Sequence, residues 1–93
     1  MYKRKTTVIN RTGIHARPAS VFVNEAKKFL SSITICNLSL QEQNNTANAK
    51  SIIKVLTLAL SQGAEVEISA DGPDEKAAVD ALIELINSGF GET

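Results

Sequence analysis

The stretch Ala64-Glu65-Val66-Glu67-Ile68-Ser69-Ala70 alternates strictly between apolar and polar side chains. Because successive side chains of a strand point to opposite faces, this alternation predicts a strand with one face in the core and the other in water. A sheet built around such a strand needs a covering layer on only one of its faces. The stretch therefore favours a two-layer domain in which helices pack against one side of an antiparallel sheet.

A helix is predicted directly after this strand. Pro73 suits a first helical turn, and the negative charges of Asp74 and Glu75 suit the positive end of a helix dipole. Gly89 is expected to end the helix. The side chains predicted to face the core recur at helical spacing and are Ala78, Ala81, Leu82, Leu85 and Ile86.

Before the strand, residues 51–60 predict a short helix that is almost entirely apolar, with Ser51 as its N-cap. A short helix cannot bury apolar side chains on every face, so we expect Ile52, Ile53 and Leu56 to stay partly exposed. Exposed apolar patches often mark docking sites. The alternative is a core helix whose outer face the rest of the chain covers.

The first half of the chain predicts another helix between two strands. Residues 2–9 and 33–37 are rich in β-formers and are expected to be strands. Pro18 fits the first turn of the intervening helix, where backbone donors lack intrahelical partners. That helix is predicted over residues 16–30, with a buried stripe formed by Ala19, Phe22, Val23, Ala26 and Leu30.

The polar segment 41–48 is expected to form a long hairpin connection that carries a short third strand at its end. The element order is then β-α-β-β-α-β-α. This order predicts an α+β fold with a four-stranded antiparallel sheet covered on one face by three helices. The chain has no internal repeat or linker, so residues 1–93 are expected to form a single domain.

Composition limits the function classes. Ten basic and ten acidic side chains cancel, which gives no electrostatic case for nucleic acid or a membrane surface. No apolar run approaches the roughly 20 residues that span a bilayer, and the first residues lack a signal-peptide stretch. We therefore expect a cytoplasmic protein without membrane insertion. We also expect a monomer, because the sequence indicates no interface beyond the proposed docking patch. Cys36 is the only cysteine and is expected to be a small buried side chain, and no metal site is expected.

The only histidine, His15, stands where the first helix is expected to begin. A lone histidine is usually structural, but this position has a specific chemistry. The N–H groups of Ala16 and Arg17, together with the helix dipole, would form an anion site. The positive helix end favours the neutral imidazole, whose lone pair can attack phosphorus. The Arg17 guanidinium lies off the apolar stripe, where it can bind phosphate oxygens or remain a solvated charge.

Nothing around His15 resembles a hydrolytic site. The sequence has no P-loop, no metal-ligand cluster and no serine–histidine–acid order. A histidine that takes phosphate without a nucleotide site is better explained as a relay than as an enzyme. One protein would supply the phosphoryl group and another would remove it, and no cofactor is expected.

The run from Thr12 to Ser20, Thr-Gly-Ile-His-Ala-Arg-Pro-Ala-Ser, resembles the active-site signature of the HPr phosphocarrier family. This family belongs to the bacterial phosphoenolpyruvate-dependent sugar phosphotransferase system. Residues 49–53 resemble the family's second signature, around a regulatory serine, and residues 63–75 resemble its last strand and helix start. The resemblance covers essentially the whole chain.

The resemblance implies an open-faced β-sandwich in which the Nδ1 atom of His15 receives phosphate from enzyme I. His15 would then pass the phosphate to sugar-specific phosphotransferase components, while Arg17 steadies it. The resemblance also implies a partner-binding surface, here called the docking face. Its residues would be Thr12, Ser20, Val21, Asn24, Ile52, Ile53 and Leu56.

The resemblance further implies that a serine kinase, with a matching phosphorylase, modifies Ser51. A phosphoserine at a helix N-terminus is favoured by the dipole, and its charge could repel an acidic partner. A plain N-cap serine is the alternative. The chain departs from the family in having Lys54 where a glycine is usual, which adds bulk and charge to the docking face. The segment 38–49 is also longer than expected.

Two other functions remain open at this stage. The protein could be a regulatory binding protein that acts through phosphorylated Ser51 on a catabolite-control transcription factor, or a carrier in a nitrogen-related phosphorelay. The presence of His15 favours the carrier over the regulator. A structural domain without activity would leave the first signature unexplained.

Overall fold

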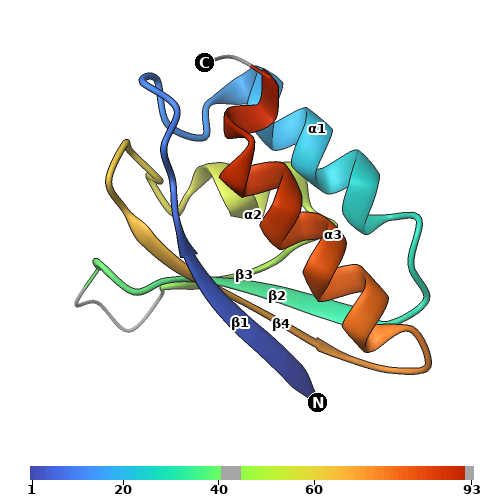
Figure 1. The fold of residues 1–93 in the computed structure, drawn as a ribbon. Coiled ribbons are helices and arrows are strands. Elements are labelled where there is room, and N and C mark those ends of the chain that lie inside the picture. The colour runs from blue at the N-terminus through green and yellow to red at the C-terminus, as the bar shows by residue number, and fades with distance from the viewer. Residues whose placement is uncertain (41–44, 92–93) are drawn as a thin grey trace.

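Four strands form one antiparallel sheet in the computed structural model, which describes residues 1–40 and 45–91 (Figure 1). The strands are β1 (Tyr2–Thr7), β2 (Ser32–Asn37), β3 (Thr46–Asn48) and β4 (Glu65–Asp71). Their order in the sheet is β1-β4-β2-β3. Ile68 of β4 pairs with Arg4 of β1 on one side and with Ile35 of β2 on the other. The alternating strand is therefore internal, so its alternation sets which face of the sheet is apolar.

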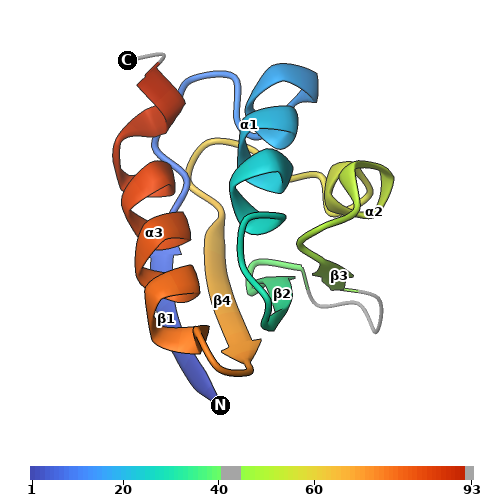
Figure 2. The ribbon, with the colours of Figure 1, turned by 90° about the vertical axis from the view of Figure 1, so that its right-hand side faces the viewer.

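The helices cover one face of this sheet (Figure 2). They are α1 (Ala16–Ala26), α2 (Ile52–Leu56) and α3 (Glu75–Asn87), followed by the short 3-10 helix η1 (Gly89–Gly91). Val66, Ile68 and Ala70 of β4 are buried, whereas Glu65 is exposed. The α+β class and the open-faced β-sandwich are thus confirmed.

The core lies between the two layers. Phe22 of α1, Ile35 of β2 and Leu82 of α3 are each completely buried. Full burial of a side chain of this kind stabilises a fold by about 1.5–3 kcal/mol. Burial of Phe22 anchors α1 in the core, and the start of α1 therefore has a fixed position at one end of the sheet.

The predicted end of the first helix is wrong. α1 stops at Ala26, with Lys27 as C-cap, and Leu30 is 82% exposed instead of buried. The N–H of Phe29 bonds to the carbonyl of Ala26 at 3.2 Å, which tightens the chain into a turn. The stripe therefore ends one turn early, and Phe29 packs against the core in place of Leu30.

The predicted buried stripe of the last helix is correct only in part. Ala78, Leu82 and Ile86 are buried as expected, and Gly89 follows the helix with a positive φ of 68°. Ala81 and Leu85 are half-buried, because they turn toward a shallow groove shared with Glu25 of α1. The two positions missed by the prediction, Val79 and Ile83, are buried in their place.

Other differences are small. β1 ends at Thr7, and α2 ends at Leu56, although the chain beyond α2 still buries Leu58 and Leu60. β3 confirms the short third strand; the centre of the predicted hairpin, residues 41–44, lies outside the described residues.

Cys36 is half-buried in β2 instead of fully buried, because its side chain lies on the face of the sheet that the helices leave open. Burial and the nearby Glu67 raise the pKa of its thiol. Among the described residues, no helix is long and apolar enough to span a membrane.

Asp74 ties the start of α3 to the end of the α1–β2 connection. Its carboxylate accepts from the backbone N–H of Leu30 at 2.8 Å, the N–H of Ser31 at 2.9 Å and the Ser31 hydroxyl. These bonds, that of the Ser31 hydroxyl first, hold the pKa of Asp74 below its usual value of 3.8. The bonds favour the ionised form.

We predict that Asp74→Asn lowers the urea midpoint of unfolding at neutral pH and that this effect disappears in acid. A carboxyl whose pKa is depressed in the folded state stabilises above its unfolded pKa and loses that contribution as pH falls through the folded value. Urea titrations at about pH 7 and about pH 2 measure the difference. Asp71→Asn is the control, because the Asp71 carboxylate is 70% exposed. An equal loss at both pH values would contradict the prediction.

Candidate functional site

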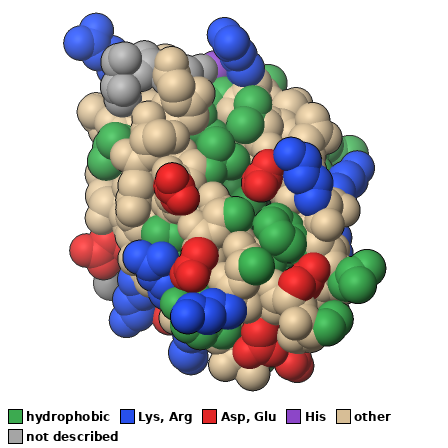
Figure 3. Space-filling view, turned by 45° about the vertical axis from the view of Figure 1, so that its right-hand side comes forward, with side chains coloured by type: hydrophobic (Ala, Val, Ile, Leu, Met, Phe, Trp, Pro, Cys, Tyr) green, Lys and Arg blue, Asp and Glu red, His purple; other side chains and the backbone are tan. Residues whose placement is uncertain are grey.

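His15 is the N-cap residue of α1, as predicted. Its backbone is extended, with φ −94° and ψ −164°, and its carbonyl accepts from the N–H of Ala19 at 2.9 Å. The imidazole is exposed and does not cap the helix. The N–H groups of Ala16 and Arg17 therefore lie in the first turn, where an α-helix supplies no acceptors of its own. Figure 3 shows the imidazole at the upper rim of the molecule, with a basic side chain beside it.

The loop that leads into His15 is closed by short-range hydrogen bonds. The N–H of Gly13 donates to the carbonyl of Asn10 at 3.0 Å, and the amide of Asn10 donates back to the carbonyl of Gly13. The N–H of Ile14 donates to the carbonyl of Leu60 at 2.7 Å. Ile14 itself is 5% exposed. The residue before His15 is therefore anchored both by its backbone and by its side chain.

Gly13 is required at the closest approach of this loop to the α2–β4 connection. Its φ is +69°, a region that side chains disfavour. A Cβ atom on Gly13 would lie 2.3 Å from the carbonyl oxygen of Leu60. The glycine of the first signature thus allows the backbone contact that positions His15.

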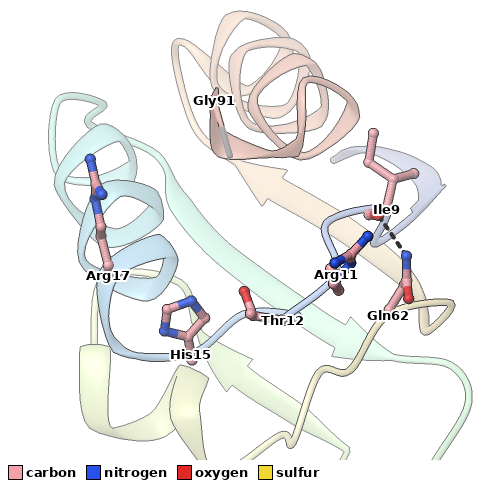
Figure 4. Close-up of a pocket in the computed structure, with 7 residues that line it drawn as sticks. All are labelled: Ile9, Arg11, Thr12, His15, Arg17, Gln62 and Gly91. Atoms are coloured by element: carbon pink, nitrogen blue, oxygen red, sulfur yellow. Dashed lines mark hydrogen bonds between the residues drawn. The ribbon is translucent and has the colours of Figure 1, made fainter. Parts of the chain in front are cut away.

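The α2–β4 connection is tied to the end of β1 by three further bonds. The N–H of Gly63 donates to the carbonyl of Val8 at 2.8 Å, and the N–H of Val8 donates to the carbonyl of Ala64 at 2.9 Å. The amide of Gln62 donates to the carbonyl of Ile9 at 3.1 Å (Figure 4). Together these bonds hold the β1–α1 loop and the α2–β4 connection, which are distant in sequence, side by side next to His15.

A hollow of about 850 Å³ lies beside these two loops. Figure 4 shows Arg17 on one side of His15 and Arg11 on the other, with Thr12 between His15 and Arg11. The described residues that line the hollow include two guanidinium groups and no carboxylate. This charge favours an anionic ligand. The lining residues are Ile9, Arg11, Thr12, His15, Arg17, Gln62 and Gly91.

Sequence reasoning singled out three of these residues and missed the other four. Arg11 adjoins Thr12 in the same turn, but nothing in the sequence shows where its side chain lies. Gln62 and Gly91 come from distant segments and reach the hollow only through the tertiary fold. The predicted docking residue Thr12 lies in the hollow itself, next to the imidazole (Figure 4).

The other docking residues lie on α1 and α2, which pack side by side (Figure 2). Val21 is 39% exposed, Ile53 is 72% exposed and Leu56 is 40% exposed, while Ile52 is half-buried. The expectation that these apolar side chains of α2 stay partly exposed is confirmed. On α1, Ser20 is half-buried and Asn24 is exposed.

Ser51 is the N-cap of α2, as predicted, and its hydroxyl accepts from the N–H of Lys54 at 3.4 Å. Its side chain is half-buried. The neighbouring Lys50 ammonium donates to the carbonyl of Phe29 at 2.8 Å, which ties the start of α2 to the turn after α1. Lys54 is exposed. Ser51 therefore lies next to the exposed apolar side chains of α2.

No cluster of three or more histidine, cysteine or acidic side chains that could hold a metal ion occurs in the part of the chain that the structure describes. The chemistry available at His15 is instead that of an exposed imidazole, backbone N–H donors and guanidinium groups.

Comparison with known proteins gives consistent matches over nearly the whole chain. Residues 2–88 match the family described as "PTS HPr component phosphorylation site". The phosphocarrier protein HPr of Haemophilus influenzae is 46% identical over 86 residues, which cover 92% of this chain and 95% of that protein. The crystal structure of HPr-C-His from Thermoanaerobacter tengcongensis matches with a TM-score of 0.88 and 44% identity, covering 100% of this chain and 99% of the other.

A similar segment also occurs inside a longer protein. The multiphosphoryl transfer protein of Vibrio cholerae is 45% identical over 83 residues, which cover 89% of this chain but 20% of that protein.

We predict that Gly13→Ala destabilises the protein by at least about 2 kcal/mol, because it adds a steric overlap with Leu60 to the cost of a positive φ. Gly63→Ala is the matched control: its φ is +90°, but nothing lies within 4 Å of its added Cβ. It should cost only about 1 kcal/mol. Urea unfolding of both variants measures the difference, and equal losses would show that the Gly13–Leu60 approach does not constrain the loop.

Proposed function

Because this chain belongs to the HPr family of phosphocarrier proteins of the phosphotransferase system, we propose that its His15 accepts a phosphoryl group from enzyme I and passes it to sugar-specific components. The observation that carries the proposal is the exposed imidazole at the start of α1, inside a hollow lined by two arginines. Among the described lining residues, this arrangement places a nucleophile and positive charge together, with no carboxylate beside them.

The proposed reaction is a direct transfer. The lone pair on Nδ1 of neutral His15 forms a bond to phosphorus, while the bond between phosphorus and the donor atom breaks and its electron pair stays on the donor. The transition state of such a transfer is loose, with negative charge on the three equatorial oxygens. The N–H groups of Ala16 and Arg17 offer hydrogen bonds to these oxygens. The second transfer repeats these steps with His15 as the donor.

Arg17 adds its guanidinium to this set. In Figure 4 its side chain extends away from the imidazole, so contact with a phosphoryl group requires a change of side-chain torsion. Arg17 is exposed, and an exposed arginine changes rotamer readily. A charge-assisted bond to a phosphoryl oxygen is about twice as strong as a neutral one, which favours the rotated state once phosphate is present.

In this proposal the protein is a carrier and not an enzyme, and it works as a cytoplasmic monomer without a cofactor. Its partners dock on the docking face, which joins the hollow through Thr12 and extends over α1 and α2. The exposure of Ile53 and Leu56 supports this role, because apolar side chains in water gain free energy when a partner covers them.

We also propose that phosphorylation of Ser51 regulates docking, with a serine kinase and phosphorylase as partners and a catabolite-control transcription factor as a further one. The position of Ser51 beside Ile52 and Ile53 supports this. A phosphoserine there would place about two negative charges at the border of an apolar contact. Desolvating these charges opposes docking of an apolar partner surface.

We predict that His15 is the phosphoryl acceptor. Incubation with enzyme I and phosphoenolpyruvate should yield one acid-labile phosphoryl group per chain, detected by mass and by phosphorus NMR. His15→Gln should take none, because glutamine has no comparable nucleophile. Enzyme I that phosphorylates a known HPr but leaves this chain unlabelled would refute the sugar-relay assignment. In that case a nitrogen-type enzyme I becomes the donor to test.

We also predict that negative charge on the docking face weakens the association with enzyme I. Ile53→Asp and Ser51→Asp should each slow phosphoryl transfer from enzyme I by about tenfold, equal to about 1.4 kcal/mol of lost association energy. Initial transfer rates at limiting concentration measure this effect.

Leu30→Asp is the matched control for Ile53→Asp, because Leu30 is 82% exposed and Ile53 is 72% exposed, but Leu30 follows the opposite end of α1. Ser51→Ala separates loss of the N-cap from gain of charge. Equal rates for Ile53→Asp and Leu30→Asp would show that α2 is not part of the docking face. Equal rates for Ser51→Asp and Ser51→Ala would show that charge at Ser51 does not control docking.

A further inference from the structure

We infer that Arg11 is a second cation that holds the phosphoryl group, placed across His15 from Arg17. The inference rests on the proposed function, because it assigns a further positioning residue to the same site. It starts from the observation that Arg11 lines the hollow together with His15, Thr12 and Arg17.

The backbone on both sides of Arg11 is fixed. The carbonyl of Ile9 accepts from the Gln62 amide at 3.1 Å, and the carbonyl of Asn10 accepts from the N–H of Gly13 at 3.0 Å. Asn10 is itself 1% exposed. Arg11 therefore extends from an anchored turn, and only its exposed side chain is free to rearrange. An anchored base reduces the entropy lost when the guanidinium binds a ligand.

Among the described residues that line the hollow, the arginine side chains carry positive charge and no carboxylate lies beside them. Elsewhere in the chain, Arg4 forms an ion pair with Asp80 at 3.0 Å, and Lys28 forms one with Glu25 at 3.0 Å. Within residues 1–40 and 45–91, neither Arg11 nor Arg17 forms such a pair. Two positive charges thus face one hollow, and a phosphoryl group with about two negative charges would balance them.

The two arginines also lie on different sides of the His15 imidazole. Arg17 and the first-turn N–H groups belong to α1, on one side of His15, whereas Arg11 lies on the loop side, beyond Thr12 (Figure 4). A phosphoryl group in transfer spreads its charge over three oxygens around the line of transfer. Donors on α1 leave the oxygen that faces the loop to a donor from the loop side. Arg11 is the cation that can bind an oxygen on the opposite side.

The test uses phosphoprotein prepared with phosphoramidate, so that it does not depend on enzyme I. A guanidinium beside the phosphoryl group stabilises its dianion, so removing it should raise the pKa of the group. We expect Arg11→Gln to raise this pKa, followed by phosphorus NMR, by about 0.5 pH unit. Arg11→Lys should restore part of the shift, because it keeps the charge but not the planar fork.

Lys3→Gln is the matched control, since it removes one exposed positive charge from β1 at the far end of the sheet. Urea unfolding of each variant checks that the fold is intact. The transfer rate from enzyme I should fall about fivefold in Arg11→Gln and stay unchanged in Lys3→Gln.

A phosphoryl pKa in Arg11→Gln that equals the one in Lys3→Gln would overturn the inference. If the transfer rate fell without that shift, Arg11 would be acting on the partner protein and not on the phosphoryl group, which also overturns it. Failure of the proposed function is distinguishable from both, because wild-type protein would then take no label from enzyme I while the phosphoramidate product still showed the Arg11 shift.

Discussion

The contact on which the site depends is the hydrogen bond from the N–H of Ile14 to the carbonyl of Leu60, at 2.7 Å. It joins the loop before α1 to the connection between α2 and β4, two segments more than 40 residues apart. The bond requires Gly13 at its side, because any Cβ there would overlap the same carbonyl. This contact holds together the end of β1, the start of α1 and the start of β4 at one corner of the fold. His15 lies at this corner.

This corner provides electrostatic preorganisation for an anion. The first turn of α1 supplies backbone donors that need no reorganisation when an anion arrives, and the arginines supply charge on flexible stems. A carrier needs such a balance, because its phosphoryl group must be stable enough to survive diffusion and labile enough to leave. Fixed backbone donors combined with exposed arginine side chains are suited to this.

α1 connects the hollow beside His15 to the exposed apolar side chains of α2. Its first residues lie at the hollow, its buried stripe holds it on the sheet through Phe22, and its outer face adjoins α2. The side chain of Lys50, bonded to the carbonyl of Phe29 at 2.8 Å, holds α2 beside α1. Exposed apolar side chains on α2 are thus kept at a constant position relative to His15.

The sequence by itself determined the elements whose signals are local. Alternation over residues 64–70 predicted β4 and the covered face of the sheet, the spacing of Ala19, Phe22, Val23 and Ala26 predicted α1, and the residues around His15 predicted an N-cap at an anion site. The tertiary structure alone decided the exposure of Leu30, the burial of Val79 and Ile83, and the meeting of Arg11, Gln62 and Gly91 around the hollow. The reason is that the periodicity of apolar residues shows which side chains an element is able to bury. The direction of a turn, the rotation of a helix on the sheet and the approach of two distant loops depend instead on packing between elements.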